Sequence, residues 1–275
     1  MMTNNYETVI PLDSTYAPAK QLLSFADTNA LLELSDQNQQ SFLQFWTTSE
    51  PTVILGLNDK RLPDLTAGLQ AVIAQDYHYF LRNSGGLAVI SDPGILNVSY
   101  FLPGQGQQLN TSEAYEIMKL LIASALPELA IQNYEIKHSY CPGSYDLSVN
   151  GKKIAGIAQR RHKDAIALMI YISINGDQNH RGQVIRQFYD HGKADYQVDD
   201  FPLVHADSMT TLAALNPKLA DINLIKQRIL GVLDLTTANI DHSVMKTASY
   251  QAIQQKALKN MQRRNEVLPT LKEVK

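Results

Sequence analysis

Apolar residues alternate with other residues through the middle of the chain, and this pattern predicts β-strands. Along 165–174 the apolar positions on one face are Ile166, Leu168, Ile170, Ile172 and Ile174. A period of two is typical of a strand that packs one face on a core. Two further strands are expected at 145–149 and 152–160, and the dipeptide between them, Asn150-Gly151, favours a tight hairpin turn. The sequence therefore predicts a three-stranded antiparallel meander.

Shorter apolar stretches and helical spacings surround this meander. Strands are expected at 42–46, 52–57, 79–82, 87–91 and 96–102. Helices are expected at 16–34, 182–189, 210–215, 222–233 and 247–263. One more helix has a well-marked start, because Asn110 and Glu113 form a capping-box pair, and it should stop near Pro127. The chain is therefore expected to mix helices and strands.

Composition and charge restrict the class of protein. The 275 residues are 44% apolar and 19% charged, which is enough hydrophobic material for a globular core. The formal net charge of −3 gives no general attraction to nucleic acid, so no nucleic-acid partner is expected. The strongest apolar run, 166–172, is too short to cross a membrane, and the first residues do not resemble a signal peptide. We therefore expect a cytoplasmic protein with no membrane partner.

The chain has one cysteine, Cys141, in a polar stretch where a Pro-Gly pair predicts a loop. A single thiol excludes an internal disulfide, and the seven histidines lack metal-ligand spacing, so no metal is expected. A lone cysteine is often a small buried hydrophobe. Here, however, His138, Asp146, Lys152 and Lys153 are near in sequence and could stabilise a thiolate or move its proton. The residues alone leave both interpretations open.

Two other segments have the residue types of a binding site. Successive strand residues point to opposite faces, so only one of Lys152 and Lys153 can readily face solvent; beside Lys153, Gly156 leaves room for a ligand. The segment 82–86, Arg-Asn-Ser-Gly-Gly, could bring backbone amides and an arginine to an anionic or carbonyl group. A simple glycine turn explains 82–86 equally well. The segment matches neither a Walker loop nor a dinucleotide-binding loop.

Three segments together resemble the biotin/lipoate protein ligase and lipoyl/octanoyl transferase superfamily. They are Arg-x-Ser-Gly-Gly at 82–86, Asp-x-Gly-x-x-Asn at 92–97, and Gly-x-Lys-Ile-x-Gly at 151–156, which is followed by Ala158-Gln159. The resemblance implies an α/β fold of the α+β type, with a mixed, largely antiparallel sheet flanked by helices. It also implies a catalytic domain over 1–245, with a C-terminal helix and tail over 246–275 packed on the same domain.

Within this superfamily, the stretch 139–148 and the pair Arg160-Arg161 resemble octanoyl-[glycine cleavage H protein]:protein N-octanoyltransferases. The resemblance implies that Cys141 is the nucleophile and that Lys153, which could also favour the thiolate, contacts the acyl carbonyl. Substrate-binding positions expected on the same basis are Arg82, Ser84, Gly85, Gly86, His78 and Gly156. The acyl chain needs an apolar tunnel, for which the candidate lining is Leu87, Val89, His78 and Ile157.

The implied reaction moves an octanoyl or lipoyl group between two lysines. The donor would be the glycine cleavage H protein, and the acceptors would be lipoyl domains of 2-oxoacid dehydrogenase E2 subunits. One amide replaces another through a Cys141 thioester, so no ATP or other cofactor is expected. Docking charges are expected at Arg160, Arg161, Lys163 and the basic C-terminal helix, although a solvated basic face explains the helix as well. A monomer is expected.

Three alternatives stay open at this stage. The first is an ATP-dependent lipoate ligase, although such enzymes usually have a third glycine where this chain has Leu87. The second is a transferase that takes octanoyl from an acyl carrier protein thioester. The third is a non-catalytic protein that binds acyl groups or lipoyl domains, with Cys141 in the core. The sequence does not decide between octanoyl and lipoyl groups.

Overall fold

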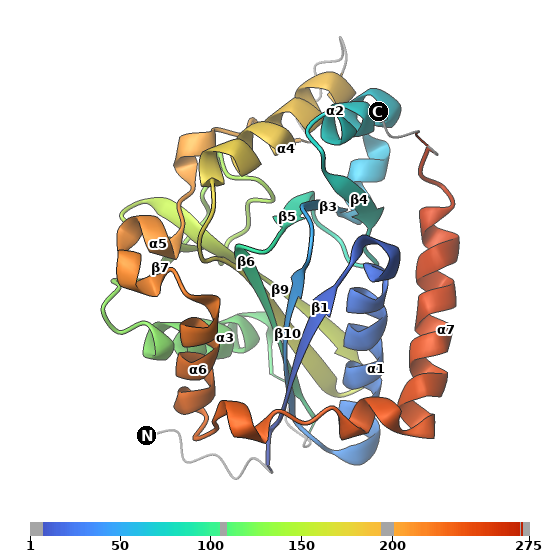
Figure 1. Cartoon of the computed structure of the whole chain (residues 1–275), viewed down its shortest axis with the longest axis vertical. Coiled ribbons are helices and arrows are strands. Elements are labelled where there is room, and N and C mark those ends of the chain that lie inside the picture. The colour runs from blue at the N-terminus through green and yellow to red at the C-terminus, as the bar shows by residue number, and fades with distance from the viewer. Residues whose placement is uncertain (1–7, 105–108, 194–200, 270, 272–275) are drawn as a thin grey trace.

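A computed structural model describes residues 8–104, 109–193, 201–269 and 271 (Figure 1). Its main sheet has seven strands in the order β1-β2-β6-β10-β9-β8-β7, and a smaller sheet has the order β4-β3-β5. The strands are β1 Ile10–Tyr16, β2 Phe42–Thr48, β3 Thr52–Leu55, β4 His78–Leu81, β5 Val89–Ser91, β6 Ile95–Leu102, β7 Gln132–Asn133, β8 Leu147–Val149, β9 Lys152–His162 and β10 Ala165–Ser173. Among the strand pairs of these described ranges, β1–β2 and β3–β4 are parallel and the others are antiparallel. The expected mixed, largely antiparallel sheet is confirmed.

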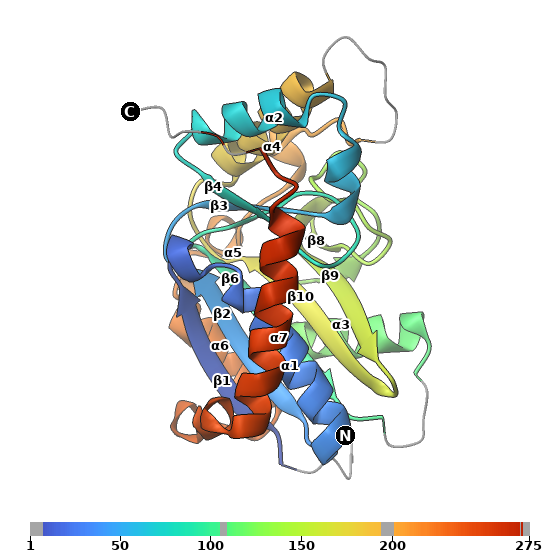
Figure 2. The same cartoon turned by 90° about the vertical axis from the view of Figure 1, so that its right-hand side faces the viewer.

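Helices cover both faces of the main sheet. They are α1 Leu23–Asn38, α2 Leu65–Ile73, α3 Thr111–Ala125, α4 Gln178–Lys193, α5 Leu212–Leu215, α6 Ile222–Val232 and α7 Ala248–Asn265. Helix α1 lies against one face with α7 packed outside it, while α3 and α6 cover the other face (Figure 2). Helices α2 and α4 pack together beside the small sheet. None of the helices in the described ranges is long and apolar enough to cross a membrane.

Several predicted elements are present with the expected chemistry. The predicted meander is β8-β9-β10, and Asn150 and Gly151 at its first turn have φ values of 52° and 77°. The predicted capping box begins α3: Asn110 Oδ1 accepts from Glu113 N at 3.0 Å, and Glu113 Oε2 accepts from Asn110 N at 2.8 Å. These local signals predicted both elements correctly.

Strands β1 and β7 and helix α2 were not expected from the sequence. Strand β1 occupies residues before and including Tyr16, so the helix expected from residue 16 begins only at Leu23. Helix α2 follows Asp64, whose side chain accepts from Ala67 N at 2.9 Å. Strand β1 is stabilised by parallel pairing with β2, about thirty residues along the chain, which a local pattern does not reveal.

The C-terminal part of the chain contacts the rest of the molecule. Tyr250 of α7 donates to Asp27 of α1 at 2.7 Å. Beyond α7, Tyr79 donates to the carbonyl of Pro269 at 2.9 Å, and Asn265 bonds both backbone groups of Leu81. Residues 270 and 272–275 of the expected tail lie outside the described residues. The domain division at residue 245 stays a prediction.

Candidate active site

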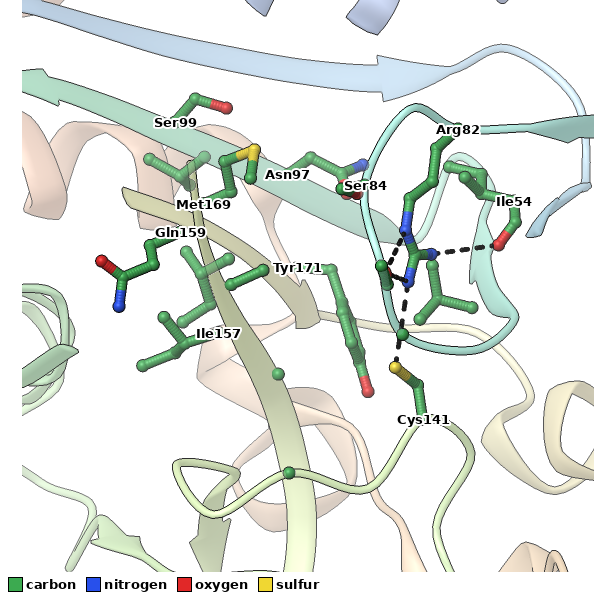
Figure 3. Close-up of a pocket in the computed structure, with 18 of the residues that line it drawn as sticks. Ile54, Arg82, Ser84, Asn97, Ser99, Cys141, Ile157, Gln159, Met169 and Tyr171 are labelled. Carbon is green, nitrogen blue, oxygen red and sulfur yellow. Dashed lines mark hydrogen bonds between the residues drawn. The ribbon is translucent and has the colours of Figure 1, made fainter. Parts of the chain in front are cut away.

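A cavity of about 360 Å³ lies between the main sheet, α1 and the loop after β4 (Figure 3). Its floor follows the strand register, since Tyr171 of β10 is paired with Gly156 and Asn97, and Met169 is paired with Ala158 and Ser99. Its other lining residues are Phe25, Thr28, Trp46, Ile54, Arg82, Ser84, Gly85, Gly86, Val89, Val98, Tyr115, Cys141, Pro142, Gly143, Asp146, Ile157, Gln159 and Ile170. In size and in its mixed lining, the cavity resembles a small-molecule site.

Cys141 lies at one end of this cavity, away from Ser99, Met169 and Gln159 (Figure 3). Its backbone has a φ of 45°, an uncommon value for a residue with a side chain. Its Sγ accepts from the backbone N–H of Leu87 at 3.4 Å and lies 4.0 Å from Nη2 of Arg82. The sulfur thus has an amide donor and a guanidinium beside it, and reactive cysteines are commonly found in such electropositive surroundings. The loop therefore presents a candidate nucleophile.

Arg82 also organises the loop that faces Cys141. Its side chain is 7% exposed and donates to the carbonyls of Ile54 at 3.2 Å, Gly85 at 3.0 Å and Leu87 at 2.9 Å. Gly86 has a φ of 83°, and a Cβ there would lie 2.9 Å from Arg82 Nη2. The guanidinium of Arg82 therefore holds the backbone of the predicted arginine-glycine segment in place, and the same carbonyls fix the position of the guanidinium.

A buried carboxyl supports this loop from behind. Asp59 accepts from Gly56 N at 2.7 Å and from Tyr189 OH at 2.8 Å. Gly56 in turn contacts the backbone of Gly86, where a Cβ on Gly56 would come within 2.1 Å of the carbonyl oxygen. Burial raises the pKa of Asp59 to about 6, and its hydrogen bonds and Arg82 oppose that rise.

Lys153 is buried and holds the Cys141 loop. Its Nζ lies 2.9 Å from Asp146 Oδ1 and 2.9 Å from the Cys141 carbonyl, with Tyr140 O at 3.0 Å and Ser139 Oγ at 3.2 Å. An ammonium has three hydrogens, so these four acceptors occupy it fully. Lys153 is 1% exposed and is not among the cavity-lining residues. In this structure it positions the nucleophile, and its expected contact with the acyl carbonyl stays a prediction.

Asp146 and His138 form hydrogen bonds within or next to the same loop. Asp146 Oδ2 accepts from Ile136 N and Gly143 N, both at 3.2 Å. Burial raises the pKa of Asp146, and the charge and hydrogen bond of Lys153 oppose this. His138 bonds the carbonyl of Leu203 at 3.2 Å and does not line the cavity. These contacts favour a structural role for both residues over proton transfer.

The structure brings together most of the residues selected from the sequence. The expected residues that line the cavity are Cys141, Arg82, Ser84, Gly85, Gly86, Gly156, Val89 and Ile157. His78 does not line it: this residue begins β4, its ring contacts Glu50 at 2.8 Å, and four strand residues place it about 13 Å from Arg82. Leu87 contributes its backbone N–H to Cys141 and is not among the lining residues.

Several lining residues were missed at the sequence level. Met169 and Tyr171 occupy the face of β10 opposite the isoleucines, and the predicted alternation already placed them there. The Tyr171 hydroxyl points toward the Cys141 end, and burial raises its pKa well above the ordinary value (Figure 3). Asn97 is the last residue of the Asp-x-Gly-x-x-Asn motif at 92–97, whereas Ser99 has no comparable local signal. Within the described ranges, no group of three or more His, Cys, Asp or Glu side chains is arranged to hold a metal ion.

Comparison with known proteins identifies the family. The model of the lipoyl protein ligase A/B catalytic domain matches residues 21–234. The chain belongs to this family. Solved structures agree with the fold: lipoate-protein ligase A bound with ATP superposes with a TM-score of 0.68 at 15% identity, covering 92% of this chain and 94% of that one. A bi-partite lipoate protein ligase from Thermoplasma acidophilum gives 0.65 at 15%, covering 98% and 100%. The expected ligase-type fold is confirmed.

Within this family, the chain is similar to curated N-octanoyltransferases and an N-lipoyltransferase. The chain is 36% identical over 254 residues to octanoyl-[GcvH]:protein N-octanoyltransferase of Anoxybacillus flavithermus, covering 92% of this chain and 91% of the relative. The protein of that name from Oceanobacillus iheyensis is 38% identical, with coverages of 79% and 78%. Lipoyl-[GcvH]:protein N-lipoyltransferase of Listeria monocytogenes is 44% identical, with coverages of 67% and 67%. The expected resemblance to this acyltransferase family is confirmed.

Proposed function

We propose that the protein transfers an octanoyl or lipoyl group from a lysine of the glycine cleavage H protein to a lysine of a lipoyl domain, through a thioester on Cys141. The observation that carries this proposal is the position of Cys141 Sγ, at the end of the cavity and beside the Leu87 amide and Arg82. The names of the relatives support the donor and the acyl groups. The 2-oxoacid dehydrogenase acceptors rest on the resemblance described above.

The reaction has two balanced half-reactions. In the first, the Cys141 thiolate attacks the acyl carbonyl, a C–S bond forms, the C–N bond breaks, and the donor lysine takes one proton from solvent and leaves as the neutral amine. In the second, the neutral amine of an acceptor lysine attacks the thioester carbonyl, a C–N bond forms, the C–S bond breaks, the thiolate leaves, and the acceptor nitrogen releases one proton to solvent. One amide is consumed and one is made, so the proposal includes no ATP.

The residues around Cys141 have distinct roles in this proposal. The Leu87 N–H and the Arg82 guanidinium stabilise the thiolate and lie where oxyanion charge develops during attack. Lys153 fixes the loop through the Tyr140 and Cys141 carbonyls, so it acts as a positioning residue. The sheet floor from Tyr171 to Met169 runs away from Cys141, and two strand residues span about 7 Å, comparable to most of an eight-carbon chain.

Intact mass spectrometry tests the proposal. Wild-type protein and Cys141→Ser are incubated with octanoylated H protein and no ATP. We expect wild type to gain one octanoyl group that hydroxylamine removes, while the donor loses one. Transfer to a lipoyl domain should fall at least about 1000-fold in Cys141→Ser, because the hydroxyl is a far poorer nucleophile than a thiolate.

Other outcomes favour the alternatives. Acylation that needs ATP and free acid would indicate a lipoate ligase. Acylation only by an octanoyl carrier-protein thioester would change the donor. Unchanged function in Cys141→Ala would overturn the role of the cysteine and favour a non-catalytic binding protein.

A further inference from the structure

The hydroxyl of Tyr171 is a buried donor that the proposed mechanism leaves without a role. Among the described residues, Tyr171 is the one that lines the cavity at Cys141, the acyl cavity, and also has a buried side-chain atom without a hydrogen-bond partner. The residue is 9% exposed. Buried polar groups are normally paired, because an unpaired one costs free energy. The unpaired hydroxyl therefore indicates a partner that the substrate supplies.

The hydroxyl is directed at the reacting sulfur by a ring that is fixed in place. Tyr171 lies on β10, and Figure 3 shows its hydroxyl pointing toward Cys141. The ring packs against the backbone of β9, where a Cβ on Gly156 would come within 2.7 Å of it. The ring of Tyr140 lies 5.8 Å away between centroids, and Lys153 Nζ lies 5.7 Å from the Tyr171 centroid. The direction of the hydroxyl is thus set by packing.

The Tyr171 hydroxyl keeps its proton. Burial raises its pKa well above the ordinary value, and the negative charges that Tyr140, Asp146 and Cys141 can carry raise it further. The group is therefore a hydrogen-bond donor and a poor base. The Tyr140 hydroxyl, which could otherwise accept this proton, lies outside hydrogen-bond geometry with Tyr171 and bonds Gln178 Nε2 at 3.4 Å. The donor stays available to a group that enters the acyl cavity.

We infer that Tyr171 is a catalytic residue, whose hydroxyl donates a hydrogen bond to the acyl carbonyl oxygen as Cys141 attacks or leaves. Negative charge develops on this oxygen in both half-reactions, and a donor already in place stabilises it most in the transition state. The hydroxyl transfers no proton, so the balance of the two half-reactions is unchanged. Arg82 and the Leu87 N–H reach the sulfur from the glycine loop, whereas Tyr171 reaches it from the sheet floor (Figure 3). This inference rests on the proposed function, because it concerns attack on an acyl carbonyl at Cys141.

Tyr171→Phe tests the inference, because it removes only the hydroxyl. Acylation of Cys141 by a small octanoyl thioester, and transfer of the bound octanoyl group to an amine, are followed by mass spectrometry. Both rates should fall about 100-fold. Iodoacetamide reacts at a methylene carbon, where no oxyanion forms, so alkylation of Cys141 and its pH dependence should change by less than about twofold. Equal losses in acylation and alkylation would show that the tyrosine only positions the thiol, and unchanged acylation would exclude the hydroxyl from catalysis.

Stability provides a second and opposite signature. Removal of an unpaired buried hydroxyl should leave the midpoint of denaturant unfolding unchanged or raise it, although activity falls. Tyr250→Phe is the matched control: this tyrosine is also buried, but its hydroxyl donates to Asp27 at 2.7 Å and it does not line the acyl cavity. It should lower the midpoint and change acylation per folded molecule by less than about twofold. If Tyr171→Phe lowers the midpoint as much as Tyr250→Phe does, the hydroxyl has a partner in the free protein and the inference is wrong.

A tetrahedral adduct separates this inference from the proposed function. Heptyl trifluoromethyl ketone has the alkyl chain of an octanoyl group, and addition of the Cys141 thiolate to its carbonyl gives an ionised tetrahedral adduct without a carrier protein or ATP. Its protection of Cys141 against iodoacetamide is titrated in wild type and Tyr171→Phe. An inhibition constant at least about 10-fold higher in the variant would support the role of Tyr171, even if octanoylated H protein fails to acylate wild type and the proposed donor is wrong. Equal constants would overturn that role whatever the donor proves to be.

Discussion

The two faces of the main sheet differ in how their side chains pack, although the same strands form both. On one face, Ile166, Leu168, Ile170 and Ile172 of β10 pack with apolar residues of β6, α3 and α6 in a continuous core. On the opposite face, the register groups Tyr171 and Met169 with small or polar partners, namely Gly156, Asn97, Ala158 and Ser99. These residues of the second face line the cavity together with Val98, Ile157 and Ile170 of the first face, and the rest of the first face is filled.

One face of the sheet contributes mainly to stability, whereas the other contributes the side chains of the candidate active site. The filled face gains from apolar burial and dense packing. The cavity face includes a buried Lys153–Asp146 pair, an arginine enclosed by carbonyls and left-handed backbone at Gly86 and Cys141, each of which requires compensating contacts. Substitutions on the two faces should therefore differ in kind.

The largest effect on the cavity side is expected from Lys153→Met. Without the ammonium, Asp146 remains buried without its ion-pair partner, and the Cys141 loop loses three further contacts. The free energy of unfolding should fall by about 3–5 kcal/mol, and acyl transfer should fall with it. Denaturant unfolding measures the first quantity. Adding Asp146→Asn should restore part of the stability but not the activity. A loss below about 1 kcal/mol would contradict the compensating role of this pair.

On the filled face, Leu168→Ala should affect stability alone. Leu168 is 0% exposed, so truncation leaves a cavity in the core and should lower the free energy of unfolding by about 2–5 kcal/mol. Transfer activity per folded molecule, measured well below the melting temperature, should stay within about twofold. If Leu168→Ala lost activity while its free energy of unfolding stayed unchanged, the proposed difference between the two faces would be wrong.

Asp59, behind the glycine loop, should make stability depend on pH. Its pKa in the folded protein is about 6, above its ordinary value, so between about pH 4 and 6 the folded state holds a proton that the unfolded state has lost. The contribution of Asp59 to the free energy of unfolding therefore falls as pH rises through this window, by roughly 3 kcal/mol. Asp59→Asn should flatten this slope in denaturant titrations. Identical slopes in both proteins would refute the assignment.

The smallest effect compares two adjacent glycines. Gly86→Ala forces a side chain into a φ of 83° and toward Arg82 and Cys141, and should cost about 1–2 kcal/mol and slow acylation. Gly85→Ala is the control, because its Cβ would meet nothing within 4 Å. Unfolding and acylation rates are measured for both variants. Similar results for the two would show that the loop does not depend on the backbone of Gly86.

Elements that depend on interactions between neighbouring residues could be predicted from the sequence. The Asn110–Glu113 cap, the turn at Asn150-Gly151 and the alternation along β10 were all informative because each depends on neighbouring residues. The contact between Arg82 and Cys141 joins positions 59 residues apart, and no local pattern encodes it. His78, which the resemblance led us to expect in substrate binding, does not line the cavity, and its role in binding stays a prediction. The resemblance brought the right segments together, but not the engagement of Lys153 with the loop.

The single cysteine at the end of the acyl cavity has a consequence for turnover. Under the proposed reaction, donor and acceptor lysines must reach the same sulfur, so one carrier protein has to depart before the other arrives. A long residence time of the first carrier would then delay the exchange, and an excess of either carrier would exclude its counterpart. Binding of each carrier protein should therefore be brief, with an affinity low enough for rapid exchange between carriers.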